Sequence, residues 1–168
     1  MKSKRLKKLT KGKNVFLSKG VSKVKVTEDG KPICYEIPVK STGITELVDT
    51  FGKQTPKPPV KNMKVTPDSD IAKEMGYTRN EWIKMHDFTD QGYLDEVKEH
   101  ESDLGIAIVM KGLDLILEDE EGKEITDHDQ KIETLKEMGM SGDQFSQIVD
   151  DIMNLTRWTE EEQKHFLS

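Results

Sequence analysis

One long apolar stretch limits how this chain can fold. Residues 104–117 are apolar or glycine except for Lys111 and Asp114. As a helix this stretch would be roughly 20 Å long, whereas a membrane-spanning helix needs about 20 apolar residues. The stretch therefore predicts a buried core helix. Because the helical spacing of apolar residues continues towards the N-terminus, we expect the helix to begin near Gly92, with Asp90 as its cap.

The composition indicates one intracellular, soluble domain with an appended arm or a small subdomain. The chain has 168 residues, of which 33% are hydrophobic and 35% are charged, and this composition is typical of exposed helices rather than of full disorder. Its single cysteine, Cys34, excludes an internal disulfide and is typical of a reducing cytosol. Residues 1–13 lack the apolar segment of a secretory signal, and no later stretch is long enough to cross a membrane.

The charge is divided between two opposite halves. Residues 1–64 hold 16 Lys and Arg against 5 Asp and Glu, whereas residues 65–168 hold 10 against 27. Such asymmetry is typical of a chain with an interaction tail or with electrostatically distinct surfaces. It favours an acidic partner for the N-terminal half.

The N-terminal half predicts three segments. Residues 1–20 form a basic flexible arm, because they contain no acidic residue. Residues 21–51 form a β-hairpin and a short helix, since alternating apolar residues flank the turn signal Asp29-Gly30 and an apolar stripe follows at helical spacing. Residues 52–67 form an extended linker rich in proline and lysine.

The C-terminal segment, residues 68–168, predicts an acidic helical body. All prolines of the chain precede it, so helices can run through it without a proline break. Helix-start signals recur along it, at Asp68 or Ser69, at Thr78 with Glu81, at Thr126 or Asp127, at Ser141 with Gln144, and at Thr159. We therefore expect an α+β fold that is mainly α, with an N-terminal hairpin followed by five to six helices.

No motif in the sequence predicts catalysis or a bound cofactor. Asp127, His128 and Asp129 have metal-binding side chains, but neighbouring side chains at a helix start diverge, and aspartate is favoured there as a cap. Ser141 lies in a string that departs from the nucleophile motif Gly-x-Ser-x-Gly at its last position. We expect a protein that is not an enzyme and that needs neither a metal nor a cofactor.

The basic arm is the candidate for electrostatic binding. It includes Lys2, Lys4, Arg5, Lys7 and Lys8, which could neutralise phosphates. No aromatic platform accompanies them, and the acidic C-terminal half would repel the same nucleic acid. An acidic protein, including the acidic half of a neighbouring copy, is therefore favoured over nucleic acid as the partner.

Four strings of the sequence carry a resemblance to a known family. They are Lys-Pro-Ile-Cys-Tyr-Glu-Ile-Pro-Val-Lys-Ser (residues 31–41), Thr-Pro-Lys-Pro-Pro-Val-Lys (55–61), Met-Lys-Gly-Leu-Asp-Leu (110–115) and Leu-Thr-Arg-Trp-Thr-Glu-Glu-Glu (155–162). The chain has a short β segment followed by acidic helices and a polar tail. In the order and composition of these segments, it resembles the tail assembly chaperones of long-tailed bacteriophages.

This resemblance implies a non-catalytic role in the cytoplasm of a bacterial host. Members of that family coat the long helical tape-measure protein and help tail-tube subunits polymerise around it. The residues expected to contact the client are Met110, Leu113, Ile116, Trp158 and Phe166, with the basic arm guiding partners and with self-association of copies along the client. The alternatives are a nucleic-acid-associated or regulatory adaptor that acts through the basic arm, and a minor structural tail protein.

Overall fold

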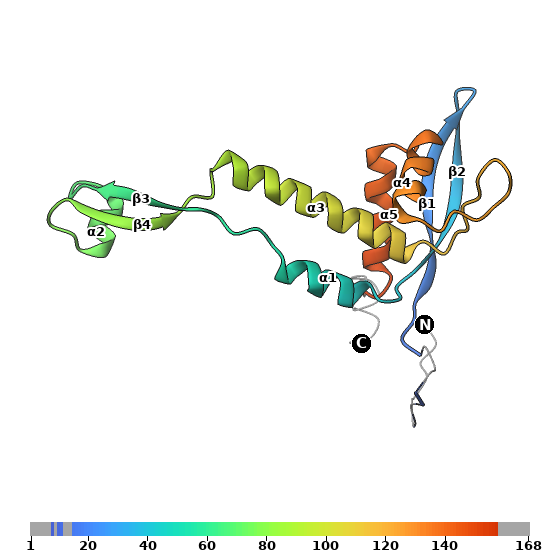
Figure 1. Cartoon of the computed structure of the whole chain (residues 1–168), viewed down its shortest axis with the longest axis horizontal. Helices are drawn as coiled ribbons and strands as arrows, with labels where there is room; N and C mark the ends of the chain where they lie inside the picture. The colour runs from blue at the N-terminus through green and yellow to red at the C-terminus, as the bar shows by residue number, and fades with distance from the viewer. Residues whose placement is uncertain (1–7, 9, 12–14, 158–168) are drawn as a thin grey trace, which may run out of the picture. The chain divides into compact units, whose positions relative to one another are not determined.

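The chain has mixed α+β content, as the sequence predicts. The computed structural model describes residues 8, 10, 11 and 15–157 (Figure 1), and this part of the chain contains four strands and five helices. It divides into two compact units, which lie within Met1–Asp49 with Gly105–Ser168 (the first unit) and within Thr50–Leu104 (the second unit). The first unit is therefore built from two stretches that are distant in sequence.

The first unit is organised around the predicted N-terminal hairpin. Strands β1 (Lys19–Glu28) and β2 (Lys31–Lys40) pair antiparallel, with Glu28 opposite Lys31. Asp29 and Gly30 both have positive φ, 48° and 75°. A two-residue turn of this kind matches the right-handed twist of paired strands, and Asp-Gly is among the residue pairs that adopt it most readily. The hairpin prediction is confirmed, with a start two residues earlier than expected.

Helix α5 (Gly142–Asn154) covers one face of this hairpin (Figure 1). Its side chains Ile148 and Ile152 are almost completely buried. The hydroxyl of Ser22, 0% exposed on β1, donates a hydrogen bond of 2.6 Å to the carboxylate of Asp151. Since a buried hydroxyl is costly without a partner, this bond fixes which residues of the strand and the helix face each other.

The helix-start signals of the sequence identify most helix starts correctly. Ser69 caps α2 (Asp70–Met75), Asp127 caps α4 (His128–Glu137), and Ser141 forms the predicted capping box with Gln144 at the start of α5. Asp90 accepts a hydrogen bond from the backbone of Tyr93 at the start of α3 (Gln91–Gly112). The short helix predicted after the first hairpin is also present, as α1 (Ile44–Lys53). These helix starts depend on the local sequence, because the capping side chain and the backbone N–H groups that it binds lie within three residues of each other.

The central helix ends earlier than the apolar stretch predicts. Helix α3 stops at Gly112, and the remaining residues of the stretch continue as an extended segment. Leu113 forms an antiparallel bridge with Val39, and the backbone N–H of Asp114 donates to the carbonyl oxygen of Pro38 over 2.9 Å. The edge of the hairpin thus satisfies backbone groups that a longer helix would have paired internally.

The second unit contains a hairpin where the sequence predicts a linker and a helix. Strand β3 (Val60–Val65) lies in the predicted linker, and β4 (Glu81–His86) replaces the helix expected after Thr78. The two strands pair antiparallel, and α2 connects them (Figure 1). Both predictions are wrong because the prolines of the linker lie outside β3, and because pairing with a distant strand outweighs the local capping signal.

Some predicted features lie outside the described residues. They are the helix expected after Thr159 and, in the arm, residues 1–7, 9 and 12–14. Among the helices that the structure describes, none is long and apolar enough to cross a bilayer.

Candidate functional site

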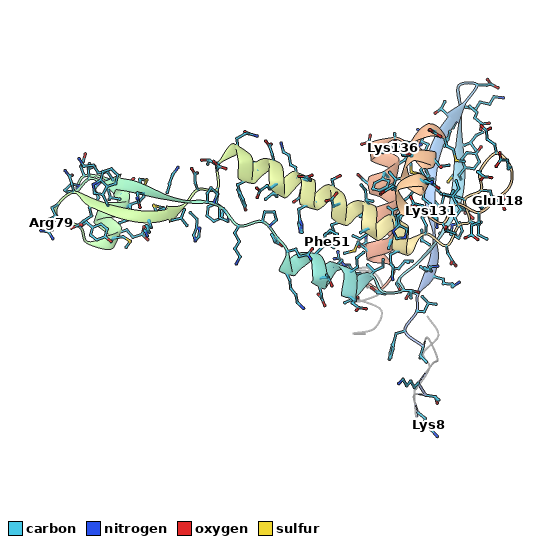
Figure 2. All side chains as sticks on the ribbon, viewed as in Figure 1. Lys8, Phe51, Arg79, Glu118, Lys131 and Lys136 are labelled. Carbon is cyan, nitrogen blue, oxygen red and sulfur yellow. The ribbon has the colours of Figure 1, made fainter. Side chains whose placement is uncertain are left out.

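A surface depression in the first unit brings together three of the predicted client-contact residues. It has a volume of about 580 Å³ and is open to solvent. We call it the basic-apolar depression, and it is lined by Lys40, Thr42, Met110, Lys111, Leu113, Asp114, Leu115, Ile116, Glu124 and Lys131. Lys40 and Thr42 lie at the end of β2 and just after it. The other lining residues come from the end of α3, the extended segment after it, the loop that contains Glu124, and α4, which carries Lys131. Lys131 is labelled in Figure 2.

The early end of α3 creates the apolar part of this depression. Because Leu113 is paired with Val39, the chain leaves the helix along the edge of the hairpin. Leu115 and Ile116 are left 40% and 66% exposed, while Leu117 is buried. Large aliphatic side chains so exposed, next to partly buried Met110, form an apolar strip without a partner in the described chain. Exposed apolar surface of this kind, rimmed by charged residues, is typical of a protein-binding site.

Asp114 anchors the depression to the end of the hairpin. Its carboxylate forms ion pairs with Lys19 over 2.8 Å and with Lys40 over 2.9 Å, and these two lysines are opposite each other in the register of β1 and β2. The hydrogen bonds from Lys19 and Lys40 lower the pKa of Asp114 to about 2. A single carboxylate therefore offsets part of the positive charge of two lysines and holds the extended segment to the hairpin.

The Asp114 ion pairs predict how stability depends on pH. The pKa of an aspartate in an unfolded chain is about 3.9, and that of Asp114 in the fold is about 2. The ion pairs therefore stabilise the fold above the unfolded value, and their contribution is lost as pH falls through about 2. We expect Asp114→Asn to lower the melting temperature at neutral pH. The difference from the wild type should disappear as the pH approaches the pKa of Asp114 in the fold, about 2.

Circular dichroism melting curves at several pH values measure this effect. Asp150→Asn is the matched control, because Asp150 is exposed on α5 and has no hydrogen bond or ion pair with a described side chain. A difference between Asp114→Asn and the wild type that stays constant from neutral pH to strongly acidic pH would contradict the ion-pair explanation.

Three lysines surround the apolar strip. Lys40, Lys111 and Lys131 all line the depression, and only Lys40 has an ion pair among the described residues. The stem of Lys111 lies over Gly43, whose φ is 70° and whose added Cβ would lie 2.7 Å from Cε of that lysine. The backbone conformation of Gly43 favours glycine, whereas the end of the flexible Lys111 side chain can shift away from a Cβ at this position. The rim thus includes the ammonium group of Lys111 on a stem that packs against the fold.

The lining of the depression combines apolar side chains with charged ones. It contains no histidine, cysteine or serine. In the part of the chain that the structure describes, no group of three or more His, Cys, Asp or Glu side chains could hold a metal ion. An apolar strip bordered by cations can instead hold the apolar face of a helix whose flanking residues are acidic.

The structure places only some of the predicted site residues. Met110, Leu113 and Ile116 lie together in the depression. Lys8 is exposed. The remaining predicted residues, Trp158, Phe166, Lys2, Lys4, Arg5 and Lys7, lie outside the described residues.

Sequence reasoning missed most of the basic rim. Lys40 and Lys131 are remote from residues 110–116 in sequence, so no local pattern connects them with the apolar strip. The available signal was the pair Lys111 and Asp114, the only charged residues within the apolar stretch. A charged residue within an otherwise apolar stretch indicates that the face of the stretch that carries the charge reaches the surface.

Comparisons with known proteins add no further constraint on this site. Protein-family models, characterised proteins and solved structures yield no match to this chain.

Proposed function

We propose that this chain is a tail assembly chaperone of a long-tailed bacteriophage. In this proposal it binds the tape-measure protein in the cytoplasm of the bacterial host, promotes assembly of the tail-tube protein around it, and acts without catalysis or a cofactor. The resemblance of its four sequence strings to that family supports the proposal, as does a surface suited to binding helices.

One observation carries the proposal, namely the exposed apolar strip within the basic-apolar depression. Leu115 and Ile116 are presented by an extended segment that is held by backbone pairing to a hairpin, so their position is fixed before a partner binds. A preorganised strip binds with a smaller entropic cost than a flexible one. Lys111 and Lys131 at its rim favour a helix with acidic residues beside its apolar face.

The size of the depression is suited to a temporary contact. Its lining has ten residues, fewer than the roughly 20–30 residues that each side of a stable complex commonly contributes. Smaller interfaces are weak and transient. An assembly chaperone needs such a contact, because it must leave the client before the particle is complete.

Co-expression with the client tests the proposal directly. We would express this chain with the large helical tape-measure protein of the same phage and analyse the soluble fraction by size-exclusion chromatography with light scattering. The proposal expects a soluble complex with several copies of this chain per client. An insoluble client beside an unchanged peak of this chain would contradict it.

The excess of lysine and arginine in residues 1–64 favours a second candidate, a nucleic-acid-associated or regulatory adaptor that acts through the basic arm. Removing residues 1–13 distinguishes the two candidates. The chaperone proposal expects the truncated chain to associate with its client about tenfold more slowly at low salt, because remote charges mainly affect the association rate. Its association rate should also depend less on salt than that of the full chain. Surface plasmon resonance at two salt concentrations measures it. Complete loss of function in the truncated chain would favour the adaptor.

A further inference from the structure

The hairpin of the second unit has one covered face and one open face. Residues that lie opposite each other in an antiparallel pair share a face. One face contains buried Val65 with partly buried Met63 and Ile83. The other face, which we call the Trp82 face, consists of Val60, Asn62, Lys64, Trp82, Lys84 and His86, and all six side chains are exposed.

Trp82 is the largest exposed side chain on this face, with 69% of its surface accessible. Lys64 lies directly opposite it, and Lys84 lies two residues further along the same strand. Residues in these positions are within reach of one another's side chains. A tryptophan flanked by cations is a frequent anchor of protein interfaces, since it supplies apolar area and the cations select an acidic partner.

The positive charge of the Trp82 face is not neutralised by the described chain. Lys61, on the opposite face, has an ion pair with Asp87 of 2.7 Å. Arg79, which is labelled in Figure 2, lies at the turn end of the hairpin and pairs with Glu81 over 3.0 Å. Lys64 and Lys84 have no such partner among the described residues. No carboxylate belongs to the Trp82 face, whose six residues include two lysines and no acid. The face is therefore complementary to a negatively charged surface.

A complementary surface is present in the first unit of the same chain. Residues 118–124, which we call the acidic loop, contain one lysine, Lys123, and five acidic residues, Glu118, Asp119, Glu120, Glu121 and Glu124. All of these side chains are exposed, and Glu118 is labelled in Figure 2.

The acidic loop has a defined conformation. Glu118 and Glu124 form an antiparallel bridge across its base, and the carboxylate of Asp119 accepts hydrogen bonds from the backbone N–H groups of Glu121 and Lys123. Glu120 and Glu121 at the turn have no ion pair with a described side chain. Two carboxylates are thus presented on a short, preordered turn, which lowers the entropic cost of binding.

We propose that the Trp82 face of one copy binds the acidic loop of a second copy. Lys64 and Lys84 pair with the carboxylates at the turn, and Trp82 packs over the backbone between them. The two surfaces are different, so the contact is heterologous, and each copy retains one free surface through which a further copy can bind. This inference does not depend on the basic-apolar depression, and it supplies a way for copies to line up along an extended client.

Nucleic acid fits the Trp82 face less well than a second copy does. Binding to single strands relies on a cationic groove with several aromatic side chains. Here one tryptophan accompanies two lysines, in a chain of net charge −6. The acidic loop, by contrast, carries a net charge opposite to that of the Trp82 face.

Sedimentation velocity with charge-swap variants tests the inference. One variant carries Lys64→Glu and Lys84→Glu, and the other carries Glu120→Lys and Glu121→Lys. At about 20 mM salt the wild type should associate with increasing concentration, and at about 500 mM salt it should not, because the Debye length shortens to a few ångström. Each variant alone should associate at least about tenfold more weakly than the wild type, since like charges then face each other. A mixture of the two variants should regain association.

A control variant and a second readout complete the test of the proposal. Lys53→Glu with Lys98→Glu changes two exposed lysines of the same unit that lie outside the Trp82 face, and it should associate like the wild type. A fluorescence titration with a single-stranded oligonucleotide in a Trp158→Phe background provides the second readout. A wild type that stays monomeric at low salt, a mixture that fails to associate, or Trp82 quenching by the oligonucleotide that is lost with Lys64→Glu would each overturn the proposal.

Discussion

Replacing Ile152 by alanine is expected to lower the free energy of unfolding of the first unit by about 2–5 kcal/mol, the range found when a large buried aliphatic residue is truncated. Ile152 is 1% exposed on α5 and lies against Gly112 at the end of α3. Truncation therefore opens a cavity where the two helices meet. Chemical denaturation followed by circular dichroism measures the change. Met138→Ala, at an exposed position of 67% accessibility after α4, should change the free energy by less than about 0.5 kcal/mol.

The contact between Gly112 and Ile152 makes this prediction sharper. A Cβ added to Gly112 would lie 2.5–2.9 Å from three carbon atoms of Ile152, which is too close for the packed helices. Gly112→Ala should therefore destabilise the wild type, but it should be nearly neutral or stabilising when Ile152 is already alanine, because the new methyl group fills the cavity. Additive effects of the two substitutions would contradict this contact, since only neighbouring residues show such coupling.

The largest functional effect is expected from the apolar strip of the basic-apolar depression. Changing Leu115 and Ile116 together to aspartate should weaken binding to a tape-measure client on the order of 100-fold, because both apolar anchors are lost and two charges are introduced. Both side chains are exposed, so the fold itself should keep its melting temperature within a few degrees. Isothermal titration calorimetry with a soluble helical fragment of the client measures the affinity.

The matched control for this variant is Met138→Asp. Met138 has a similar exposure to Ile116, 67% against 66%, but lies outside the depression. It should bind the client like the wild type. Equal loss of binding in both variants would show that general surface hydrophobicity, rather than the depression, holds the client.

The sequence by itself determined the features that depend on neighbouring residues. The turn of the first hairpin follows from Asp29-Gly30, and the starts of α2, α4 and α5 follow from side chains that bond within three residues along the chain. The separation of charge between the two halves is likewise a property of the sequence alone. These features were predictable because their energies come from local backbone conformation and local hydrogen bonds.

Only the tertiary structure decided where distant segments pair. Residues 113–117 have a helical pattern, yet Leu113 leaves the helix because Val39 offers a backbone partner far away in sequence. In the second unit, Trp82 follows a helix-start signal, yet it lies on a strand because Lys64 and its neighbours pair with it. A strand is stabilised by its partner, and that partner's position depends on the whole fold, so local patterns could not place the basic-apolar depression or the Trp82 face.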